Sequence, residues 1–589
     1  MSKGGASMTS AQRARWIVVI STVVLLLCVT RLFYIQIVRG PSLAEEGQVV
    51  RTSVSEVAAK RGSIVDANGL VLADSVQTYH VAVNQVNVAK WRHYEDQTQP
   101  DGTTKSVLVG KGPAEAAKQL APLLDMDPVE LGGKMVGTQT YVYLKKNVDA
   151  VTYRKIRELG IYGIEWESVF QRTYPNGNTA APLIGTVNES GEGSSGLEAT
   201  FDALLQGTPG KEAFEIAPNG AIMPGGKQTT QEPQDGATVT TTIRGDLQHA
   251  VQEVLDARVT QHEAEWGAVV ITDVATGKVL VMADSGSQSP DNAAPQTVRS
   301  VQYAFEPGSV GKVITMATAL EKGSVTPTSV FTVPYALDVE GEDLPITDFH
   351  EHDTQELTAT GILAESSNTG TVLIGETVSD QDRFDMMHAL GLGQPTGIEL
   401  AGESEGLVRT PDQWLGRDRY VTMFGQAYMM TALQEAGVMA TIGNGGVRMA
   451  PRLVDSWTLP DGTVHQADPV EPVQAMSSTT ASTLLRMMES TVDTEQGTGQ
   501  MAKVEGYRLA VKTGTAEIPG GTVSTVAGIV PADAPRLAVS VVLYNPKVGW
   551  LSSDSAAPLF AEAVTQAVRN LAVPASSGAA DLYPSTPGQ

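Results

Sequence analysis

A serine and a lysine stand three residues apart in the segment FEPGSVGKVITMATALEKG, a spacing that could pair a nucleophile with its base. Apolar residues recur there at helical spacing after Pro307-Gly308, so Ser309 and Lys312 are predicted to share one face of the first helical turn. A serine hydroxyl attacks poorly until a base removes its proton, and a lysine serves as that base only when burial or nearby positive charge lowers its pKa. The pattern alone is more often a capping serine followed by a solvated lysine.

Two further short motifs follow in chain order. Ser366-Ser367-Asn368 comes directly after an apolar helical stretch, and Lys512-Thr513-Gly514-Thr515 ends a predicted strand. Each is ordinary by itself, the first as a turn and the second as a strand end. The order S-x-x-K, S-x-N, K-T-G, however, is the motif set of serine β-lactamases and penicillin-binding proteins. Together the three motifs predict acyl transfer through an active-site serine.

The composition, and the residues missing from other known motifs, argue against several other functions. The 589 residues carry 41 Lys+Arg against 66 Asp+Glu, and this net charge of -25 disfavours a nucleic-acid partner. The single cysteine, Cys28, excludes an intramolecular disulfide and a zinc site built on several thiolates. GSVGK is not a phosphate-binding loop, because Glu306 and Val313 replace its first glycine and its metal-binding hydroxyl. His350-Glu351-His352-Asp353 is contiguous, so we predict a polar loop, no metal and no cofactor.

The chain resembles the class B penicillin-binding proteins, monofunctional transpeptidases that cross-link bacterial peptidoglycan, over nearly its whole length. Besides the three motifs above, Arg61–Gly69 (RGSIVDANG), Arg172–Pro175 (RTYP) and Gly196–Glu198 (GLE) resemble segments of the family's pedestal. Ala67 stands where the family usually has arginine. Gly425-Gln426-Ala427 departs from the more usual Gly-Gln-Gly or Gly-Tyr-Gly, so we assign no role to that loop.

The resemblance implies a role for each matched residue of the first two motifs. Ser309 would be acylated by the D-Ala-D-Ala end of a donor stem peptide, and Lys312 would take its proton. Ser366 would relay a proton toward the leaving amine. Asn368 would hold Lys312 and the donor's amide in place. These residues, with Lys512, are the implied catalytic set.

The third motif is implied to bind the substrate. Lys512 and the hydroxyls of Thr513 and Thr515 would hold the donor's terminal carboxylate, with Gly514 between them, while the strand edge pairs with the peptide backbone. The backbone N–H groups of Ser309 and Thr515 would form the oxyanion hole. The amine of a neighbouring stem peptide would then attack the acyl-enzyme.

Alternation and periodicity predict the elements that position these motifs. Residues 41–240 mix short alternating segments with helical patterns, as an irregular α+β pedestal does, and Gln231–Gly236 reads as a linker. With the resemblance, residues 245–572 form a penicillin-binding/β-lactamase-like transpeptidase domain, a five-stranded antiparallel sheet with flanking and inserted helices. Its strands are predicted within 266–283, 507–518, 522–530 and 536–544, before a helix over 558–571. Residues 573–589 are predicted to be a disordered tail.

The N-terminal region predicts a membrane anchor. Residues 16–38 are apolar over enough length to cross a bilayer once as a helix. Lys3, Arg13 and Arg15 favour a cytoplasmic tail over residues 1–15. Bulky residues follow the run where a cleaved signal peptide would have small ones. We expect a single-pass protein of the cell membrane, with its N-terminus cytoplasmic and the bulk of the chain outside.

The resemblance also implies partners. We expect peptidoglycan stem peptides, β-lactam antibiotics, and a SEDS-family glycan polymerase with other membrane proteins of wall synthesis, since a cross-linker must receive strands that another protein makes. The pedestal and anchor are expected to bind that polymerase, so substitutions at Arg61 or Asp66 should impair wall synthesis and leave penicillin acylation intact, with bracing of the pedestal as the alternative. A β-lactamase, a non-catalytic β-lactam sensor and a scaffold of the wall machinery are the rival functions. No Glu-x-x-Leu-Asn segment follows Asn368, which disfavours a class A β-lactamase. A role in division or in elongation stays open.

Overall fold

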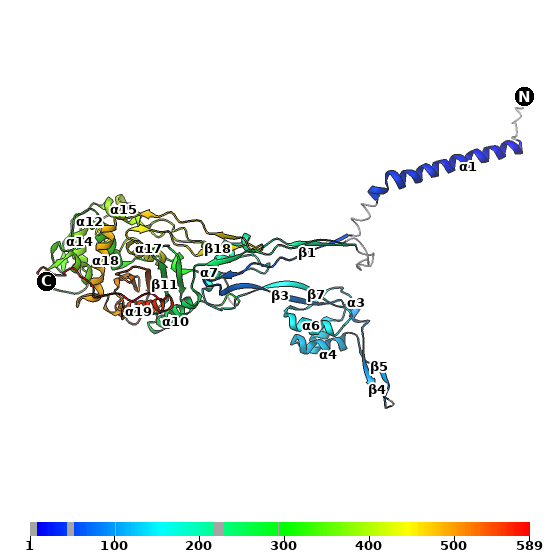
Figure 1. Ribbon diagram of the computed structural model, residues 1–589, viewed down its shortest axis with the longest axis horizontal. Coiled ribbons are helices and arrows are strands. Elements are labelled where there is room, and N and C mark those ends of the chain that lie inside the picture. The colour runs from blue at the N-terminus through cyan, green and yellow to red at the C-terminus, as the bar shows by residue number, and fades with distance from the viewer. Residues whose placement is uncertain (1–8, 44–51, 101, 216–227, 292–293, 589) are drawn as a thin grey trace, which may run out of the picture. The chain divides into compact units, whose positions relative to one another are not determined.

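The computed structural model describes residues 9–43, 52–100, 102–215, 228–291 and 294–588 (Figure 1). Contacts between residues divide the chain into two units. The first comprises Met1–Ala59 and Thr208–Gln234, and the second comprises Lys60–Gly207 and Asp235–Gln589. All of the motif residues that could do chemistry belong to the second unit.

The first unit holds the apolar N-terminal helix. Helix α1 (Ser10–Phe33) continues into a π-helical turn, η1 (Tyr34–Val38), and these 29 residues have a mean hydropathy of 2.4 and exposed side chains. One apolar helix long enough to cross a bilayer is therefore confirmed. It begins at Ser10 rather than at residue 16, because the polar residues before Trp16 continue the same helix. The unit also has a three-stranded antiparallel sheet, in the order β1 (Thr52–Val57), β8 (Gly210–Glu215), β9 (Gln228–Gln231).

A seven-stranded sheet runs through the pedestal part of the second unit. Its order is β19-β18-β10-β2-β3-β6, and β7 also pairs with β3. The strands are β2 (Ile64–Val65), β3 (Val71–Val83), β6 (Val142–Val148), β7 (Ile164–Thr173), β10 (Thr238–Thr241), β18 (Val454–Thr458) and β19 (Val464–Gln466). Since β18 comes from far along the chain, the pedestal and the following domain share one sheet across the predicted boundary near residue 240.

Short helices and a hairpin complete the pedestal. One core joins β3 and β6 to the helices and includes Val81, Leu120, Leu144 and Ile156. The elements are α3 (Gln85–Val88), α4 (Gly112–Leu124), α5 (Pro128–Lys134), α6 (Ala150–Glu158), α7 (Ala181–Ile184), α8 (Gly196–Thr200), α9 (Asp202–Leu205) and the hairpin β4 (Arg92–Thr98) with β5 (Thr104–Lys111).

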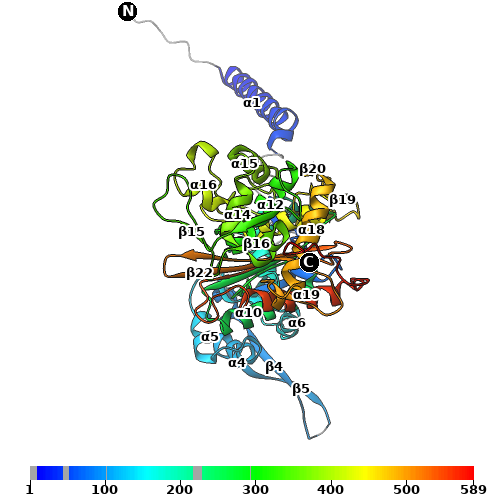
Figure 2. The same ribbon diagram turned by 90° about the vertical axis from the view of Figure 1, so that its left-hand side faces the viewer.

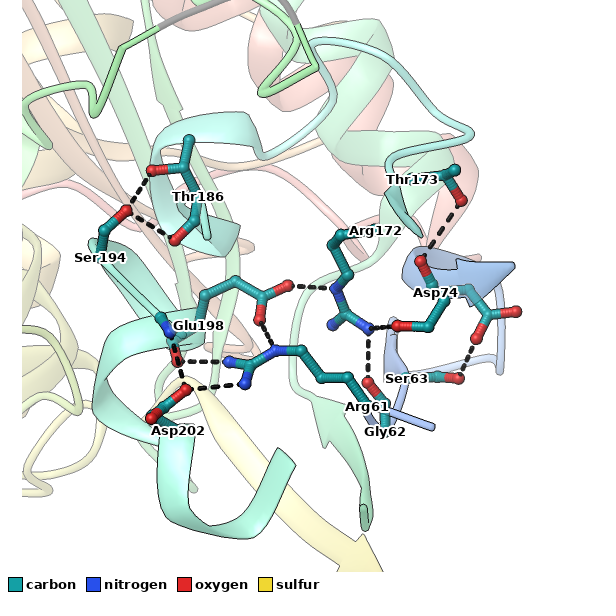
Figure 3. Close-up of polar contacts among 12 residues, drawn as sticks. Arg61, Gly62, Ser63, Asp74, Arg172, Thr173, Thr186, Ser194, Glu198 and Asp202 are labelled. Atoms are coloured by element: carbon teal, nitrogen blue, oxygen red, sulfur yellow. Dashed lines mark hydrogen bonds and ion pairs between the residues drawn. The ribbon is translucent and has the colours of Figure 1, made fainter. Parts of the chain in front are cut away.

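Two buried arginines fasten the pedestal segments together (Figure 3). Arg61 donates to Glu198 Oε2 and to Asp202 Oδ1, each at 2.7 Å. Arg172 donates to Glu198 Oε1 and to the carbonyl oxygen of Gly62, each at 2.6 Å. Glu198 is fully buried, so its carboxylate binds both guanidinium groups out of water. Such charge-assisted bonds hold three separate chain segments in one geometry.

The side chains of Arg61 and Asp66 are both buried. Their exposed fractions are 6% and 1%. Asp66 accepts hydrogen bonds from the backbone N–H groups of Asn68, Leu70 and Gly245, which ties the pedestal loop to the start of α10 (Gly245–Gln261). Their burial and internal hydrogen bonds favour the alternative, in which Arg61 and Asp66 brace the pedestal fold.

The five-stranded antiparallel sheet predicted for the second domain is confirmed, in the order β12-β11-β23-β22-β21. Its strands are β11 (Trp266–Asp273), β12 (Val279–Asp284), β21 (Ala510–Ile518), β22 (Gly521–Val530) and β23 (Leu537–Tyr544). Figure 2 shows α10 and α19 (Ala556–Asn570) on one side of the sheet and the inserted helices on the other. Alternate strand residues, such as Val269 and Val270, enter the two separate cores.

The insertion between β12 and β21 is mainly helical. Its principal helices are α12 (Lys312–Glu321), α13 (Ala359–Glu365), α14 (Asn368–Gly375), α15 (Asp380–Ala389), α17 (Ala432–Gly443) and α18 (Ser478–Asp493). Shorter elements connect them, namely α11 (Arg299–Gln302), η2 (Gly308–Gly311), β13 (Val330–Val333), β14 (Ala336–Leu337), β15 (Ile346–Thr347), β16 (Gln355–Thr358), η3 (Pro411–Gln413), α16 (Asp418–Val421), η4 (Thr422–Phe424), β17 (Val447–Arg448), β20 (Val473–Gln474) and η5 (Gln500–Ala502).

The segment after α19 differs from the predicted disordered tail. Val573 is buried and its carbonyl oxygen accepts the Tyr507 hydroxyl at 2.7 Å. Farther on, Asp581 pairs with Arg486, and Ser585 accepts a backbone hydrogen bond from Thr358. The low apolar content of this segment favours disorder, but hydrogen bonds, an ion pair and one aromatic ring hold it against the domain.

Candidate active site

The turn that carries Ser309 packs directly on strand β21. Ser309 lies in the 3₁₀ turn η2, and Lys312 begins α12, so the α-helix starts one turn later than the spacing predicts. A Cβ atom on Gly308 would lie 2.6 Å from the carbonyl oxygen of Thr515, and one on Gly514 would lie 2.3 Å from that of Pro307. Only glycine permits this approach, so the two motifs hold each other in place.

Four side chains form a continuous polar chain from the first motif to the third. Lys312 Nζ lies 2.9 Å from Ser309 Oγ and 3.1 Å from Ser366 Oγ. Lys512 Nζ donates to Ser366 Oγ at 2.8 Å and to the carbonyl oxygen of Thr513 at 2.9 Å. Ser366 therefore stands between two lysines, and one of them contacts the candidate nucleophile.

Burial prepares Lys312 to act as a base. The side chain is 1% exposed, and its desolvation lowers the lysine pKa to about 7, although Asp348 opposes the shift. Desolvation, followed by repulsion from Lys312, also places the pKa of Lys512 well below its ordinary value. At neutral pH much of Lys312 is therefore the free amine, the form that can remove a proton from Ser309.

The S-x-N motif is shaped by Asp348, a residue that sequence reasoning did not single out. Its carboxylate accepts the Ser367 hydroxyl at 2.7 Å, the Thr369 N–H at 3.0 Å, and the Asn368 N–H. His352 Nε2 lies 3.0 Å from the same carboxylate. Asp348 thus caps the start of α14 and fixes the loop in which Ser366 adopts a left-handed backbone with φ of 64°.

The side chain of Asn368 contacts a neighbouring loop. Its Nδ2 donates to the carbonyl oxygen of Thr347 at 2.9 Å, and its residue lines the same cavity as Ser309. Within the described residues its recorded partners are Thr347 and Asp348, and neither is Lys312. Among the described residues, Asn368 therefore does not make the contact with Lys312 that the resemblance implies.

Strand β21 presents a free edge beside the nucleophile. Among the described residues it is the outermost strand of the sheet and pairs with β22 on one side only. Thr513 Oγ1 donates to Thr498 Oγ1 at 2.8 Å, and Thr515 Oγ1 donates to Ser552 Oγ at 3.2 Å. An extended peptide could add to this edge through backbone hydrogen bonds, with both threonine hydroxyls nearby.

These groups surround a cavity of about 650 Å³. Ser309, Ser366, Asn368, Thr513 and Thr515 line it. Its walls also include residues outside the three motifs, from helix α13 and from several loops, among them Phe349, His350, His352, Glu365, Gln426, Thr498, Leu551 and Ser552. The predicted polar loop at 350–353 is thus a wall of the site. Three polar residues that contact the motifs lie in loops without a distinctive sequence pattern, namely Asp348, Thr498 and Ser552. No signal in a single sequence therefore identifies them.

His352 is held in the cavity wall by its contact with Asp348. Burial lowers the pKa of His352, but its bonds to the Asp353 carbonyl and to Asp348 outweigh burial and raise the pKa overall. Burial raises the pKa of Glu365, which lines the same wall. Within the described residues, no three His, Cys, Asp or Glu side chains are grouped as a metal ion would require.

Comparison with known families accounts for nearly the whole chain. The profile of the penicillin-binding protein transpeptidase domain matches residues 267–565, and that of the penicillin-binding protein dimerisation domain matches residues 56–241. The chain belongs to the class B penicillin-binding proteins. All three motifs of the cavity fall within the transpeptidase match, and the arginine network falls within the dimerisation match.

Curated relatives and solved structures agree with this membership. The penicillin-binding protein PbpB of Mycolicibacterium smegmatis is 33% identical over 94% of this chain and 89% of its own length. The peptidoglycan D,D-transpeptidase FtsI of Escherichia coli is 31% identical over 90% and 87%. A peptidoglycan synthetase of Bifidobacterium adolescentis superposes with a TM-score of 0.72 at 32% identity, covering 91% of this chain and all of that one. Penicillin-binding protein 3 of Mycobacterium tuberculosis, complexed with aztreonam, gives 0.67 at 27%, covering 90% of this chain and all of that one.

Proposed function

We propose that this protein is a peptidoglycan D,D-transpeptidase that works through an acyl-enzyme on Ser309. The neutral amine of Lys312 removes the proton of Ser309, and Oγ attacks the carbonyl carbon of the penultimate D-alanine of a donor stem peptide. The amide bond to the terminal D-alanine breaks, and that D-alanine leaves with a proton delivered through Ser366. The amine of a second stem peptide then attacks the ester carbonyl, the bond to Ser309 Oγ breaks as the cross-linking amide forms, and the proton lost by the amine restores the Ser309 hydroxyl.

Strand β21 binds the donor in this proposal. The donor's extended end adds to the free edge of β21, and the hydroxyls of Thr513 and Thr515 with the charge of Lys512 hold its terminal carboxylate. The backbone N–H groups of Ser309 and Thr515 receive the developing oxyanion. The close packing at Gly308 and Gly514 supports this role, because it brings both motifs to one point. Asn368 orients the donor's amide from the facing wall.

The observation that carries the proposal is the chain Ser309–Lys312–Ser366–Lys512. Within the described residues, neither lysine has a carboxylate at ion-pair distance, and both are buried. A structural lysine would be exposed or paired. Two unpaired buried lysines that share a serine are suited to moving protons to and from a neighbouring hydroxyl.

Treatment with penicillin tests the assignment of Ser309. Intact mass and peptide mapping of the full chain are expected to show one penicilloyl adduct, on Ser309, that persists because the ring-opened product stays in the site and leaves no room for the acceptor amine. Ser309→Ala is expected to abolish the adduct, and Ser324→Ala, a serine at the far end of α12, serves as a control. An adduct elsewhere, or its rapid hydrolysis as in a β-lactamase, would overturn the proposal.

We further propose that the N-terminus is cytoplasmic and that a SEDS-family glycan polymerase binds this protein. The apolar helix α1 and the pedestal support it, since both are present without a catalytic constellation of their own. Replacing residues 10–38 by an unrelated membrane-spanning helix is expected to abolish co-purification with the polymerase and to leave penicillin acylation intact. Protease protection of an N-terminal tag in sealed membranes tests the orientation. If co-purification with the polymerase is unchanged, α1 does not contact that partner, and this part of the proposal is wrong.

A further inference from the structure

Residues 574–588 cross the second unit from the end of α19 to the helix that precedes Ser366. Near α19, Ser576 accepts the Arg508 N–H at 2.9 Å and donates to Asp533 at 2.6 Å. At the far end, Tyr583 packs against the core formed with α12, α13 and α18, and the Arg486 guanidinium lies 4.0 Å from its ring centroid. The segment is therefore anchored at two separate places.

The far end of this C-terminal segment binds Thr358, the N-cap residue of α13. The carbonyl oxygen of Pro584 accepts the Thr358 hydroxyl at 2.6 Å, and that of Ser585 accepts the Thr358 N–H at 3.0 Å. Thr358 is the N-cap of α13, and its Oγ1 also accepts the Gly361 N–H at 3.0 Å. The segment and the helix cap thus share one set of hydrogen bonds.

The contact with α13 depends on a glycine. A Cβ atom on Gly361 would lie 2.1 Å from the carbonyl oxygen of Ser585, and its other near neighbours are also backbone atoms of Ser585. Backbone atoms cannot swing aside as a flexible side chain can. The face of α13 at Gly361 is therefore shaped to receive the 579–588 segment.

The opposite end of α13 enters the active site. The helix spans only Ala359–Glu365, and Ser366 follows as its C-cap. Ala364 accepts a hydrogen bond from Thr498, a residue of the cavity wall, at 3.2 Å. A displacement of the Thr358 end would pass along this short rigid helix to Ser366, which must stay within hydrogen-bond reach of both lysines.

We propose that residues 579–588 are a positioning segment for the transpeptidase reaction. By binding Thr358 and Arg486 they fix α13, and so they hold Ser366 Oγ between Lys312 and Lys512. The segment touches neither substrate nor the reacting atoms. This inference rests on the proposed role of Ser366, and it names a part of the chain outside all three motifs.

Shortening the chain tests the proposal directly. The full chain and a form that ends at Gly578 are compared in detergent by stopped-flow acylation with a fluorescent penicillin. The shortened form is expected to acylate about tenfold more slowly at saturating penicillin, because small misplacement of a proton-relay group lowers rates by factors of this order. The noncovalent affinity for penicillin is expected to change less than twofold. A synthetic peptide of residues 579–589 should restore the rate in a saturable manner, whereas a scrambled peptide should not.

A glycine substitution supplies a second, independent test. Gly361→Ala is expected to slow acylation in the full chain and to have no effect in the shortened form, because Ser585 is then gone. Gly437→Ala, in α17 with no atom near the added Cβ, is the matched control and should change neither form. Wild-type acylation by the shortened form, or equal effects of Gly361→Ala in both forms, would overturn the proposal. The proposal would also be overturned if the shortened form acylates slowly only in proportion to a lower melting temperature and the peptide of residues 579–589 does not restore its acylation rate. If the wild type forms no adduct on Ser309, the proposed function fails instead.

Discussion

The pedestal and the active site each bury two cations, and they treat them in opposite ways. In the pedestal, Arg61 and Arg172 both donate to the carboxylate of Glu198, and Asp202 adds a second negative charge. In the active site, Lys312 and Lys512 share only the oxygen of Ser366, and each repels the charge of the other. Carboxylates neutralise the two arginines of the pedestal, whereas neither lysine of the active site has a carboxylate at ion-pair distance among the described residues.

The difference separates a structural cluster from a reactive one. A guanidinium bonded to carboxylates stays charged and keeps its geometry, so it joins chain segments. A buried amine without a counter-ion loses its proton more readily, so it can exchange protons near neutral pH. Residue type follows the same division, because arginine cannot serve as a base and lysine can.

The largest expected effect is on acylation by Lys312 variants. Lys312→Ala should slow penicillin acylation by on the order of 10²-fold or more, the scale of a lost general base. Lys312→Arg should not rescue the rate, because guanidinium keeps its proton. In the wild type, acylation should rise about tenfold per pH unit up to pH about 7 and then level, as the pKa of Lys312 requires. Stopped-flow acylation rates of the wild type and of both variants, measured across pH 5–9, check the loss of rate and the pH profile.

Removing the buried amine of Lys312 should not by itself destabilise the protein. Since the pKa of Lys312 is lower when folded, burial of the amine opposes folding below its ordinary pKa of 10.5, and this opposition grows as the pH falls toward 7. Lys312→Met should therefore melt at or above the wild-type temperature at pH 7. Acylation within a few-fold of wild type by either the Ala or the Arg variant would mean that Lys312 is not the base.

Pedestal substitutions should show the reverse pattern. Glu198→Gln leaves Arg172 without a carboxylate, and breaking a buried ion pair in this way typically costs about 3–5 kcal/mol of folding free energy. Glu189→Gln, at an exposed loop position, is the control and should cost under about 0.5 kcal/mol. Urea unfolding measures both. Acylation per folded molecule should stay at the wild-type value, and a large loss of that rate with intact stability would contradict the structural reading.

A buried acid tests the same principle with opposite charge. Glu435, on α17, is fully buried, and among the described residues it accepts the hydroxyls of Thr525 and Ser540 with no cation at ion-pair distance. Burial raises its pKa to about 7, so the folded state binds its proton more tightly than the unfolded state does. The free energy of unfolding should therefore fall by roughly 3 kcal/mol as the pH rises from 4.5 to 7.

Glu435→Gln should remove this pH dependence. The amide has no proton to lose in this range, so the difference in stability between mutant and wild type should grow in favour of Gln as the pH rises. Urea unfolding at pH 5, 6, 7 and 8 measures the trend, with Glu189→Gln as the matched control. Parallel stability curves for Glu435→Gln and the wild type would show that the carboxylate stays ionised despite its burial.

The sequence predicts the nucleophile and its base because their chemistry depends on short spacing along one helix. It also predicts the five strands of the sheet, because their apolar runs are short and are bounded by turn residues. It does not predict Asp348, because a single aspartate in a loop becomes a helix cap only when the fold brings residue 367 to it. For a related reason the sequence does not decide between partner binding and bracing for Arg61 and Asp66, since their burial depends on partners more than a hundred residues away.

One departure from the family pattern becomes interpretable in the structure. Ala427 stands where the family more often has glycine, and its backbone has φ of 60° in the left-handed region. Its N–H donates to Glu306 Oε1 at 3.0 Å, and Gly425 in the same loop accepts the Gly308 N–H at 2.9 Å. The loop therefore supports the nucleophile turn, and an alanine holds its left-handed position at a cost of about 1–2 kcal/mol.

The smallest expected effect is a gain in stability from Ala427→Gly. Glycine removes the strain of the left-handed backbone but gives the unfolded chain more freedom, worth about 0.4–1 kcal/mol, so the net gain should be about 0.5–1 kcal/mol. Ala440→Gly, inside α17, is the control and should lose about 1 kcal/mol. A higher urea midpoint at constant m-value measures the gain. If both substitutions lower the midpoint equally, the loop does not hold Ala427 under strain, and the preference for glycine there has another cause.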